Sequence, residues 1–312
     1  MGFLATFQPM HSAITTSSAA PLVLYWTLLG APPSGANRSA VINDATKSAS
    51  GWQTRLETWP LVRLLLERIY EKRFAGNGYG AFRGVFARFE EAARSAPNNK
   101  PLGFSTQDYA EEFADRRSRI FSFDYPVMFW LAPLLSGPAR LFDYGGHCGT
   151  HFYAYAKYID YSSQMQWVVC DMPEIMQYGE KIAAEQGTKQ LTFTGRFADA
   201  DGADVLLAAG SLQYVESPTF SESLATLKSL PKHIVLNKVP LYDGPTFVTL
   251  QNGGVAFHPM YVFNRKDFID SICGLGYKLV DQWTVPSHAG RIPFHPEASF
   301  PAHSGLYFRL SD

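Results

Sequence analysis

Hydrophobic and polar positions recur along this chain with two different periods, and the change falls near Gly137. Between residues 59 and 74, apolar side chains return every three or four positions, which predicts an amphipathic helix. Further helices are predicted around residues 85–94, 106–120 and 125–135. We therefore expect residues 55–137 to be an all-helical segment that caps a site or forms a dimer interface.

After Pro138, short apolar runs alternate with helical stretches, which is typical of βαβ units on a parallel sheet. Strands are predicted at 140–144, 166–170, 191–194, 205–209 and 233–237. Helices are predicted between them at 174–185, with Gly187 as its C-cap, and at 220–229. The end of the chain predicts a strand at 246–250, a helix at 265–273 capped by Asn264, and strands at 278–284 and 305–310. An α/β, Rossmann-like domain is thus expected over residues 138–312.

Composition narrows the class of protein. Residues 1–54, rich in Ser, Ala, Thr and Pro, predict a loosely ordered arm whose one apolar stretch is too short to span a bilayer. The 27 basic and 28 acidic residues show no basic cluster, which argues against a nucleic-acid partner. Three widely spaced cysteines fit a reducing compartment. We expect a cytoplasmic protein without a membrane segment.

The stretch LFDYGGHCGTHF, residues 141–152, is the main candidate for a binding site. It follows a predicted strand and opens a predicted helix, where free backbone N–H groups meet the polar end of a cofactor. Gly145, Gly146 and Gly149 permit a tight turn and a close approach of the backbone. The register of a dinucleotide fingerprint would place His147 and Thr150 at its second and third glycines, which disfavours a pyrophosphate clamp. An ordinary strand-to-helix turn is the alternative.

Other strand ends belong to the same predicted crevice. Asp171 and Met172 close the second strand, where a carboxylate accepts hydrogen bonds from both ribose hydroxyls. The alternative role of Asp171 is to cap the following helix. Phe197 is equally a cover for an adenine ring and a core side chain. The end of the fourth strand supplies three more candidates, namely Gly210, Ser211 and Gln213.

The spacing of Asp143, Gly145, His147 and Gly149 resembles the first motif of S-adenosylmethionine (SAM)-dependent methyltransferases. Together, residues 82–97, 143–158, 204–218 and 247–254 resemble a bacterial family of SAM-dependent methyltransferases found near polysaccharide and natural-product genes. The resemblance covers about residues 55–285. It implies a class I fold, a seven-stranded, mostly parallel sheet with helices on both faces, and SAM as cofactor. Two departures stand out: His147 replaces the usual middle glycine, and Asn237 with Lys238 replaces an expected Asp-Arg pair.

Methyl transfer is an in-line displacement, so the protein mainly aligns the acceptor and excludes water. A base helps when the acceptor is a hydroxyl or a protonated nitrogen, and histidine is the usual choice. His258 is the leading catalytic candidate because it lies between the fifth strand and the last helix, and His151 is the second. Tyr214 and Gln213 are candidates to orient the acceptor. No metal-binding motif is visible in the sequence.

The sequence therefore predicts a SAM-dependent methyltransferase acting on oxygen or nitrogen of a small molecule, such as an aromatic or heterocyclic natural product, with a homodimer as the expected assembly. Two alternatives stay open. His147 is compatible with a non-catalytic, methyltransferase-like binding subunit. A nicotinamide-dependent reductase is the other alternative, and the missing third glycine counts against it.

Overall fold

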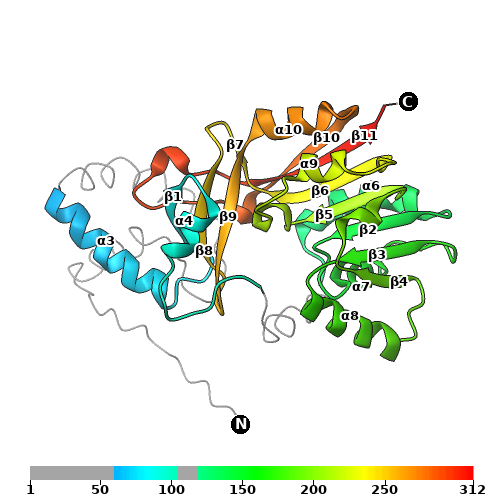
Figure 1. The fold of residues 1–312 in the computed structure, drawn as a ribbon, viewed down its shortest axis with the longest axis horizontal. Coiled ribbons are helices and arrows are strands. Elements are labelled where there is room, and N and C mark those ends of the chain that lie inside the picture. The colour runs from blue at the N-terminus through cyan, green and yellow to red at the C-terminus, as the bar shows by residue number, and fades with distance from the viewer. Residues whose placement is uncertain (1–59, 105–118, 312) are drawn as a thin grey trace, which may run out of the picture. The chain divides into compact units, whose positions relative to one another are not determined.

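The computed structural model describes residues 60–104 and 119–311 (Figure 1). The expected arm at 1–54 and nearly all of the helix expected at 106–120 lie outside the described residues. The chain divides into two compact units, residues 1–72 and 73–312. Helix α3 (Pro60–Ala75) confirms the helix expected at 59–74 and runs from the first unit into the second. The three-part division expected from the sequence stays a prediction.

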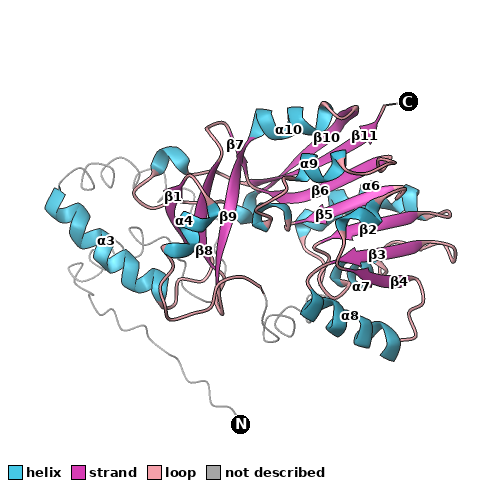
Figure 2. Cartoon of the chain, in the orientation of Figure 1, coloured by secondary structure: helices cyan, strands magenta, loops and turns pink. Residues whose placement is uncertain are grey.

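A seven-stranded sheet of the second unit has the strand order β10–β11–β6–β5–β2–β3–β4 (Figures 1 and 2). Its strands are β2 (Arg140–Tyr144), β3 (Gln166–Cys170), β4 (Leu191–Thr194), β5 (Val205–Ala209), β6 (His233–Val239), β10 (Tyr277–Val285) and β11 (His303–Leu310). Strand β11 is antiparallel to both of its neighbours, whereas β2 to β6 pair in parallel. This order, with one reversed strand next to the edge, is that of class I methyltransferases. The predicted fold class is confirmed.

Helices cover both faces of this sheet because its strands are apolar on both sides. All five residues of β5 are buried, as in a parallel sheet covered by helices. In β2, Leu141 packs with α6 (Tyr125–Leu135) and α7 (Thr150–Tyr155), while Phe142 points the other way. Phe142 packs with α9 (Phe220–Ala225) and α10 (Arg265–Cys273).

Local signals placed most of these elements correctly. Strands β2 to β5 have the predicted bounds, and α10 begins after Asn264, whose side chain accepts a hydrogen bond from the N–H of Asp267. Helix α8 (Pro173–Glu185) is followed by Gly187 in the left-handed conformation expected after a helix end. Helix α9 ends at Ala225, four residues before the predicted end.

A second sheet has the order β1–β8–β9–β7 and corrects the expectation of an all-helical segment at 55–137. Its strands are β1 (Phe82–Phe86), β7 (Leu241–Tyr242), β8 (Phe247–Asn252) and β9 (Phe257–Asn264). Strand β1, expected to be partly helical, pairs antiparallel with β8, and helix α4 (Phe89–Arg94) follows it. The helical prediction is wrong at β1 because β8, distant in the chain, supplies the hydrogen-bond partners that local sequence does not show.

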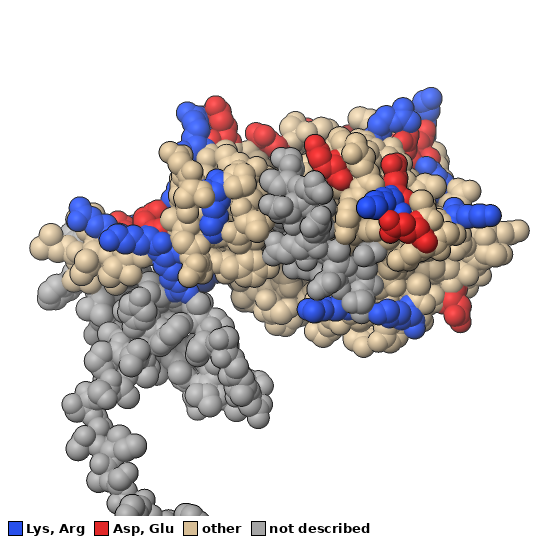
Figure 3. Space-filling view, turned by 90° about the horizontal axis from the view of Figure 1, so that it is seen from below, with Lys and Arg blue, Asp and Glu red and all other residues tan. Residues whose placement is uncertain are grey.

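The distribution of charged side chains on one face of the molecule agrees with the nearly equal numbers of basic and acidic residues. On the face shown in Figure 3, Lys and Arg side chains lie among Asp and Glu side chains and do not form one continuous stripe. Among the helices of residues 60–104 and 119–311, none is long and apolar enough to cross a membrane.

Two valines of the central sheet should differ in how much their truncation lowers the free energy of unfolding. Val235 on β6 is fully buried, whereas Val280 on β10 is 45% exposed. We expect Val235→Ala to lower the free energy of unfolding by about 2 kcal/mol, because it leaves a cavity between β6 and its neighbours. The matched control, Val280→Ala, should lower it by less than about 1 kcal/mol. Urea unfolding followed by circular dichroism measures both, and equal losses would contradict this account of the core.

Candidate active site

The carboxyl ends of the parallel strands meet at one edge of the main sheet. Tyr144 pairs with Cys170, Cys170 with Thr194, and Ala209 with Asn237. The chain proceeds from β2 to β3 and β4 on one side, then crosses to β5 and β6 on the other. In open α/β sheets, ligands bind outside the strand ends where the order reverses in this way. The glycine loop after β2 lies at this point.

The glycine loop, residues 145–149, is shaped by unusual backbone angles. Gly145, His147 and Gly149 have φ angles of 74°, 55° and 80°, all in the left-handed region. A Cβ added to Gly146 would lie 2.4 Å from the carboxyl carbon of Asp143, so only glycine fits there. His147 thus takes a conformation that glycine adopts more easily, at a cost of about 1–2 kcal/mol. The surrounding hydrogen bonds must offset this cost.

Asp171 supplies one of those bonds and fixes the loop to the end of β3. Its Oδ2 accepts from the N–H of His147 at 2.8 Å, and its Oδ1 accepts from the N–H of Met172 at 2.8 Å. Met172 occupies the N-cap position of α8, so the suggestion that Asp171 is the helix cap is wrong. Burial raises the pKa of Asp171 to about 6, although both N–H groups act to lower it.

Asp143 and His151 come together on the side of the sheet that faces α6 and α7. His151 Nδ1 lies 3.1 Å from Asp143 Oδ2, and Trp167 Nε1 donates to the same oxygen at 3.2 Å. Asp143 is fully buried, and its Oδ1 has no hydrogen-bond partner among the described residues. The structure thus pairs a predicted cofactor-binding residue with a predicted catalytic residue. Both roles stay predictions.

The end of β5 contacts the glycine loop from the opposite side. Ser211 Oγ donates to the carbonyl oxygen of Tyr144 at 2.5 Å, and a Cβ on Gly145 would lie 2.2 Å from Ser211 Cβ. Gln213 is buried, and its Nε2 donates to the carbonyl oxygen of Gly210 at 3.1 Å. The contacts of Ser211 hold the ends of β2 and β5 together, and the Gln213 bond closes the turn after β5.

Phe197 lies in the short 3-10 helix after β4. Its ring meets Tyr144 edge-on at 5.0 Å and Phe220 at 6.4 Å, against the cluster that also contains α9. It remains partly exposed. Burial is the main cause that raises the pKa of the neighbouring Tyr144 to about 12. Phe197 therefore packs on the core, and its contact with an adenine ring stays a prediction.

The leading catalytic candidate, His258, lies on β9 of the second sheet and is 2% exposed. Its ring stacks on Phe104 with centroids 3.9 Å apart, and Tyr214 meets it edge-on at 6.0 Å. Tyr214 Oη donates to Gln251 Oε1 at 2.7 Å. Burial lowers the pKa of His258 to about 4. The structure thus groups His258 with Tyr214 and places His151 beside Asp143 instead.

Lys238 is a residue that sequence reasoning noted only as a departure from a motif. It lies near the end of β6 with a φ of 57°, and a Cβ on Gly210 would be 3.3 Å from its Nζ. The neighbouring Asn237 is fully buried, donates to the carbonyl oxygen of Phe123 at 2.9 Å, and accepts from Trp283 Nε1 at 3.1 Å. The position of Lys238 at a strand end was the signal available in the sequence.

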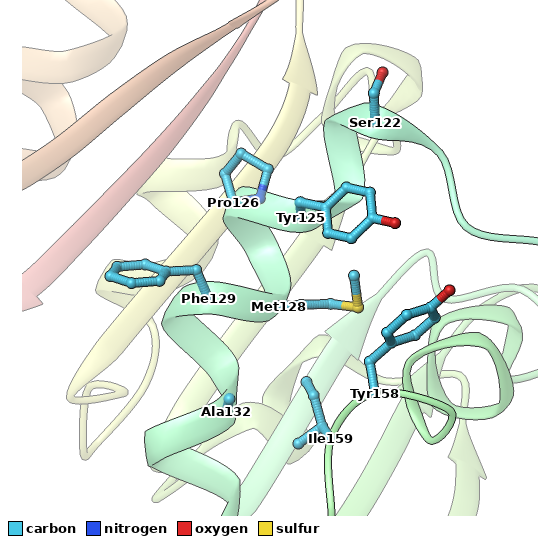
Figure 4. A pocket seen from close by; sticks show the side chains of 8 residues that line it. All are labelled: Ser122, Tyr125, Pro126, Met128, Phe129, Ala132, Tyr158 and Ile159. Atoms are coloured by element: carbon cyan, nitrogen blue, oxygen red, sulfur yellow. The ribbon is translucent and has the colours of Figure 1, made fainter.

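A separate apolar hollow of about 630 Å³ lies between α6 and the segment after α7 (Figure 4). Tyr125, Phe129 and Tyr158 line it and are more than half exposed. None of the predicted site residues lines this hollow. It is therefore distinct from the strand-end crevice.

No family model matches this chain. No curated protein matches it either. Among solved structures, it is similar to a 1,6-didemethyltoxoflavin-N1-methyltransferase from Burkholderia thailandensis with bound 1,6-didemethyltoxoflavin and S-adenosylhomocysteine. The two are 18% identical, the match covers 66% of this chain and 86% of that chain, and the TM-score is 0.45.

Two further similar structures are a SAM-dependent methyltransferase from Aquifex aeolicus and a magnesium protoporphyrin IX methyltransferase from Synechocystis with bound S-adenosylhomocysteine. The first is 13% identical, covers 65% of this chain and 98% of that chain, and has a TM-score of 0.44. The second is 12% identical, covers 67% and 89%, and has a TM-score of 0.42. These values are low, so the class of fold rests on the strand order and pairing described above.

Two glycines near the ends of β2 should differ in how much an added methyl group destabilises the protein. We expect Gly146→Ala to lower the free energy of unfolding by about 1–3 kcal/mol, because the added Cβ would overlap the Asp143 carboxyl group. Gly137→Ala is the control: its Cβ would have no atom within 4 Å, and it should change stability by less than about 1 kcal/mol. Thermal unfolding measures both variants. A neutral Gly146→Ala would show that the loop does not depend on this close approach.

Proposed function

We propose that this protein is a SAM-dependent methyltransferase that transfers a methyl group to oxygen or nitrogen of a small molecule. The observation that carries the proposal is the closure of the glycine loop onto Asp171, at the switch point of a sheet with class I strand order. That arrangement places a carboxylate and a tight backbone turn where a nucleoside-containing cofactor binds in this class of fold.

The residues present at this edge fit SAM. Asp171 as a residue is partly exposed, and each of its carboxylate oxygens has capacity for a further hydrogen bond beyond the one it accepts from the backbone. The adjacent Gly195 is exposed, and a Cβ added to it would make an ordinary contact with Met176 at 3.5 Å. Asp143 Oδ1 and Thr150 Oγ1 are buried polar atoms near the loop without a hydrogen-bond partner among the described residues.

When bound, SAM supplies an electrophilic methyl group on a sulfonium. The chain's own part is to hold the sugar hydroxyls at Asp171, to support the loop through Ser211 and Asp143, and to align the acceptor. His258 is neutral at neutral pH because burial lowers its pKa to about 4, so as a general base it would be weak. This favours acceptors that lose their proton easily, with Tyr214 as an orienting group.

The alternatives differ in what they bind. The non-catalytic alternative rests on the replacement of the usual middle glycine by His147. His147 nevertheless adopts the left-handed backbone of this loop and donates its N–H to Asp171, so the replacement leaves the loop closed. A nicotinamide-dependent reductase would bind a dinucleotide instead.

The finer parts of the proposal are a natural-product acceptor, a cytoplasmic location and a homodimer. Light scattering on the purified protein tests the last of these.

Calorimetry with SAM and S-adenosylhomocysteine tests the proposal directly, and its pH dependence tests the role of Asp171. Ribose hydroxyls donate best to the ionised carboxylate, whose pKa in the free protein is about 6. Affinity should therefore be full above this pKa and fall as the pH drops through it, reaching about tenfold weaker binding near pH 5. Asp171→Asn should bind more weakly at neutral pH and lose this pH dependence.

Asp243→Asn is the matched control, because that carboxyl group is 89% exposed and pairs with Arg265 away from the loop. It should keep the affinity and the pH dependence of the unsubstituted protein. Absence of binding to both SAM and S-adenosylhomocysteine would overturn the proposal, and binding of a nicotinamide dinucleotide alone would favour the reductase.

A further inference from the structure

Lys238 has a backbone conformation that residues other than glycine rarely adopt. Its φ of 57° lies in the left-handed region, and it is one of the few non-glycine residues described there. Such strain persists only where the surrounding structure holds it, and it is concentrated at ligand-binding sites. The left-handed turn occurs near the carboxyl end of β6, which is the edge of the sheet that carries the crevice.

The side chain of Lys238 lies over the end of β5. A Cβ on Gly210 would be 2.9 Å from Lys238 Cε and 3.3 Å from Nζ, so the lysine occupies the space that the glycine leaves. The next residue, Ser211, packs against Gly145 of the glycine loop. The ammonium group is thus on the β5–β6 side of the crevice, and the glycine loop and Asp171 are on the β2–β3 side.

An aromatic ring lies beside this ammonium group. Lys238 Nζ lies 5.4 Å from the centroid of the Phe123 ring, and His288 meets the same ring edge-on at 5.0 Å. The backbone of Phe123 is held by the side chain of Asn237, which Trp283 also contacts. The backbone of Phe123 is therefore tied to β6, the strand that carries Lys238.

Two histidine rings continue this cluster. His303 of β11 lies 5.4 Å from His288, is 6% exposed, and its Nδ1 has no hydrogen-bond partner among the described residues. Its pKa is lowered to about 3, first by burial and then by repulsion from His288 and Lys238. His303 is therefore uncharged at neutral pH, and the ammonium group of Lys238 acts on it. An ammonium group on the acceptor side of the crevice suits an anionic ligand.

We propose that Lys238 binds an anionic group, a carboxylate or a phosphate, on an aromatic methyl acceptor, with Phe123 and His288 against its apolar part. This inference rests on the proposed function, because it assigns the acceptor side of the same crevice. The acceptor is accordingly small, planar and negatively charged. Lysine is suited to this task because its ammonium group supplies several donors to one anion.

The test uses calorimetric titration of the full chain with benzoate, phenyl phosphate and uncharged benzamide, with and without S-adenosylhomocysteine. The main variant is Lys238→Asn, because asparagine tolerates the left-handed conformation and carries no charge. We expect at least one of the two anions to bind, and Lys238→Asn to weaken it about tenfold or more. Lys238→Arg keeps the charge and should retain most of the affinity. Benzamide should bind more weakly and be insensitive to Lys238.

Lys232→Asn is the matched control, since Lys232 precedes β6 at the opposite edge of the sheet and pairs with the Asp204 carboxylate. It should leave anion binding unchanged. Circular dichroism and retained S-adenosylhomocysteine binding establish that Lys238→Asn is folded. The stronger of the two anions identifies whether the acceptor carries a carboxylate or a phosphate.

The two proposals fail in different ways. If S-adenosylhomocysteine binds but neither anion does, or if Lys238→Asn binds the anions as well as the unsubstituted protein, the role of Lys238 is wrong and the cofactor assignment stands. If S-adenosylhomocysteine does not bind, the proposed function is wrong, and the anion titration without it still reports on Lys238.

Discussion

The parallel pairing of β2 with β3 on one side and β5 on the other is the constraint on which the rest of the site depends. The register brings the ends of these strands to one edge, so Gly145, Asp171 and Ser211 meet although they are distant in the chain. The glycine loop can then close onto Asp171 through the N–H of His147. Without that register, the loop would lack the bond that offsets its strained backbone.

Electrostatics divide the crevice into two sides. On the β3 side, Asp171 is held by two backbone N–H groups, and burial brings its pKa to about 6. On the β6 side, the ammonium group of Lys238 lies near the Phe123 ring, and the neighbouring His303 is neutral because its pKa is about 3. We propose that a cofactor with sugar hydroxyls and a cationic sulfonium binds on the first side and an anionic acceptor on the second. Under that proposal, the sheet brings together two reactants of complementary charge.

Sequence pattern was sufficient for the parallel half of the fold and insufficient for the second sheet. Strands β2 to β5 are short apolar runs between turns, so their signal is local. Strand β1 carries a weaker signal, and its partner β8 is encoded far downstream. Local propensity favoured a helix there, and pairing across the chain decided otherwise. The same limitation explains why β9, which carries His258, was not predicted as a strand.

What the sequence by itself determined is the class of fold, the glycine loop and the acidic residue after the second strand, because each depends on residues that are close in the chain. Only the tertiary structure decided that Asp143 pairs with His151, that burial makes His258 a weak base, and that Lys238 reaches across Gly210. Burial and partner distance set the pKa and the orientation of a side chain, and both arise only when distant segments pack together.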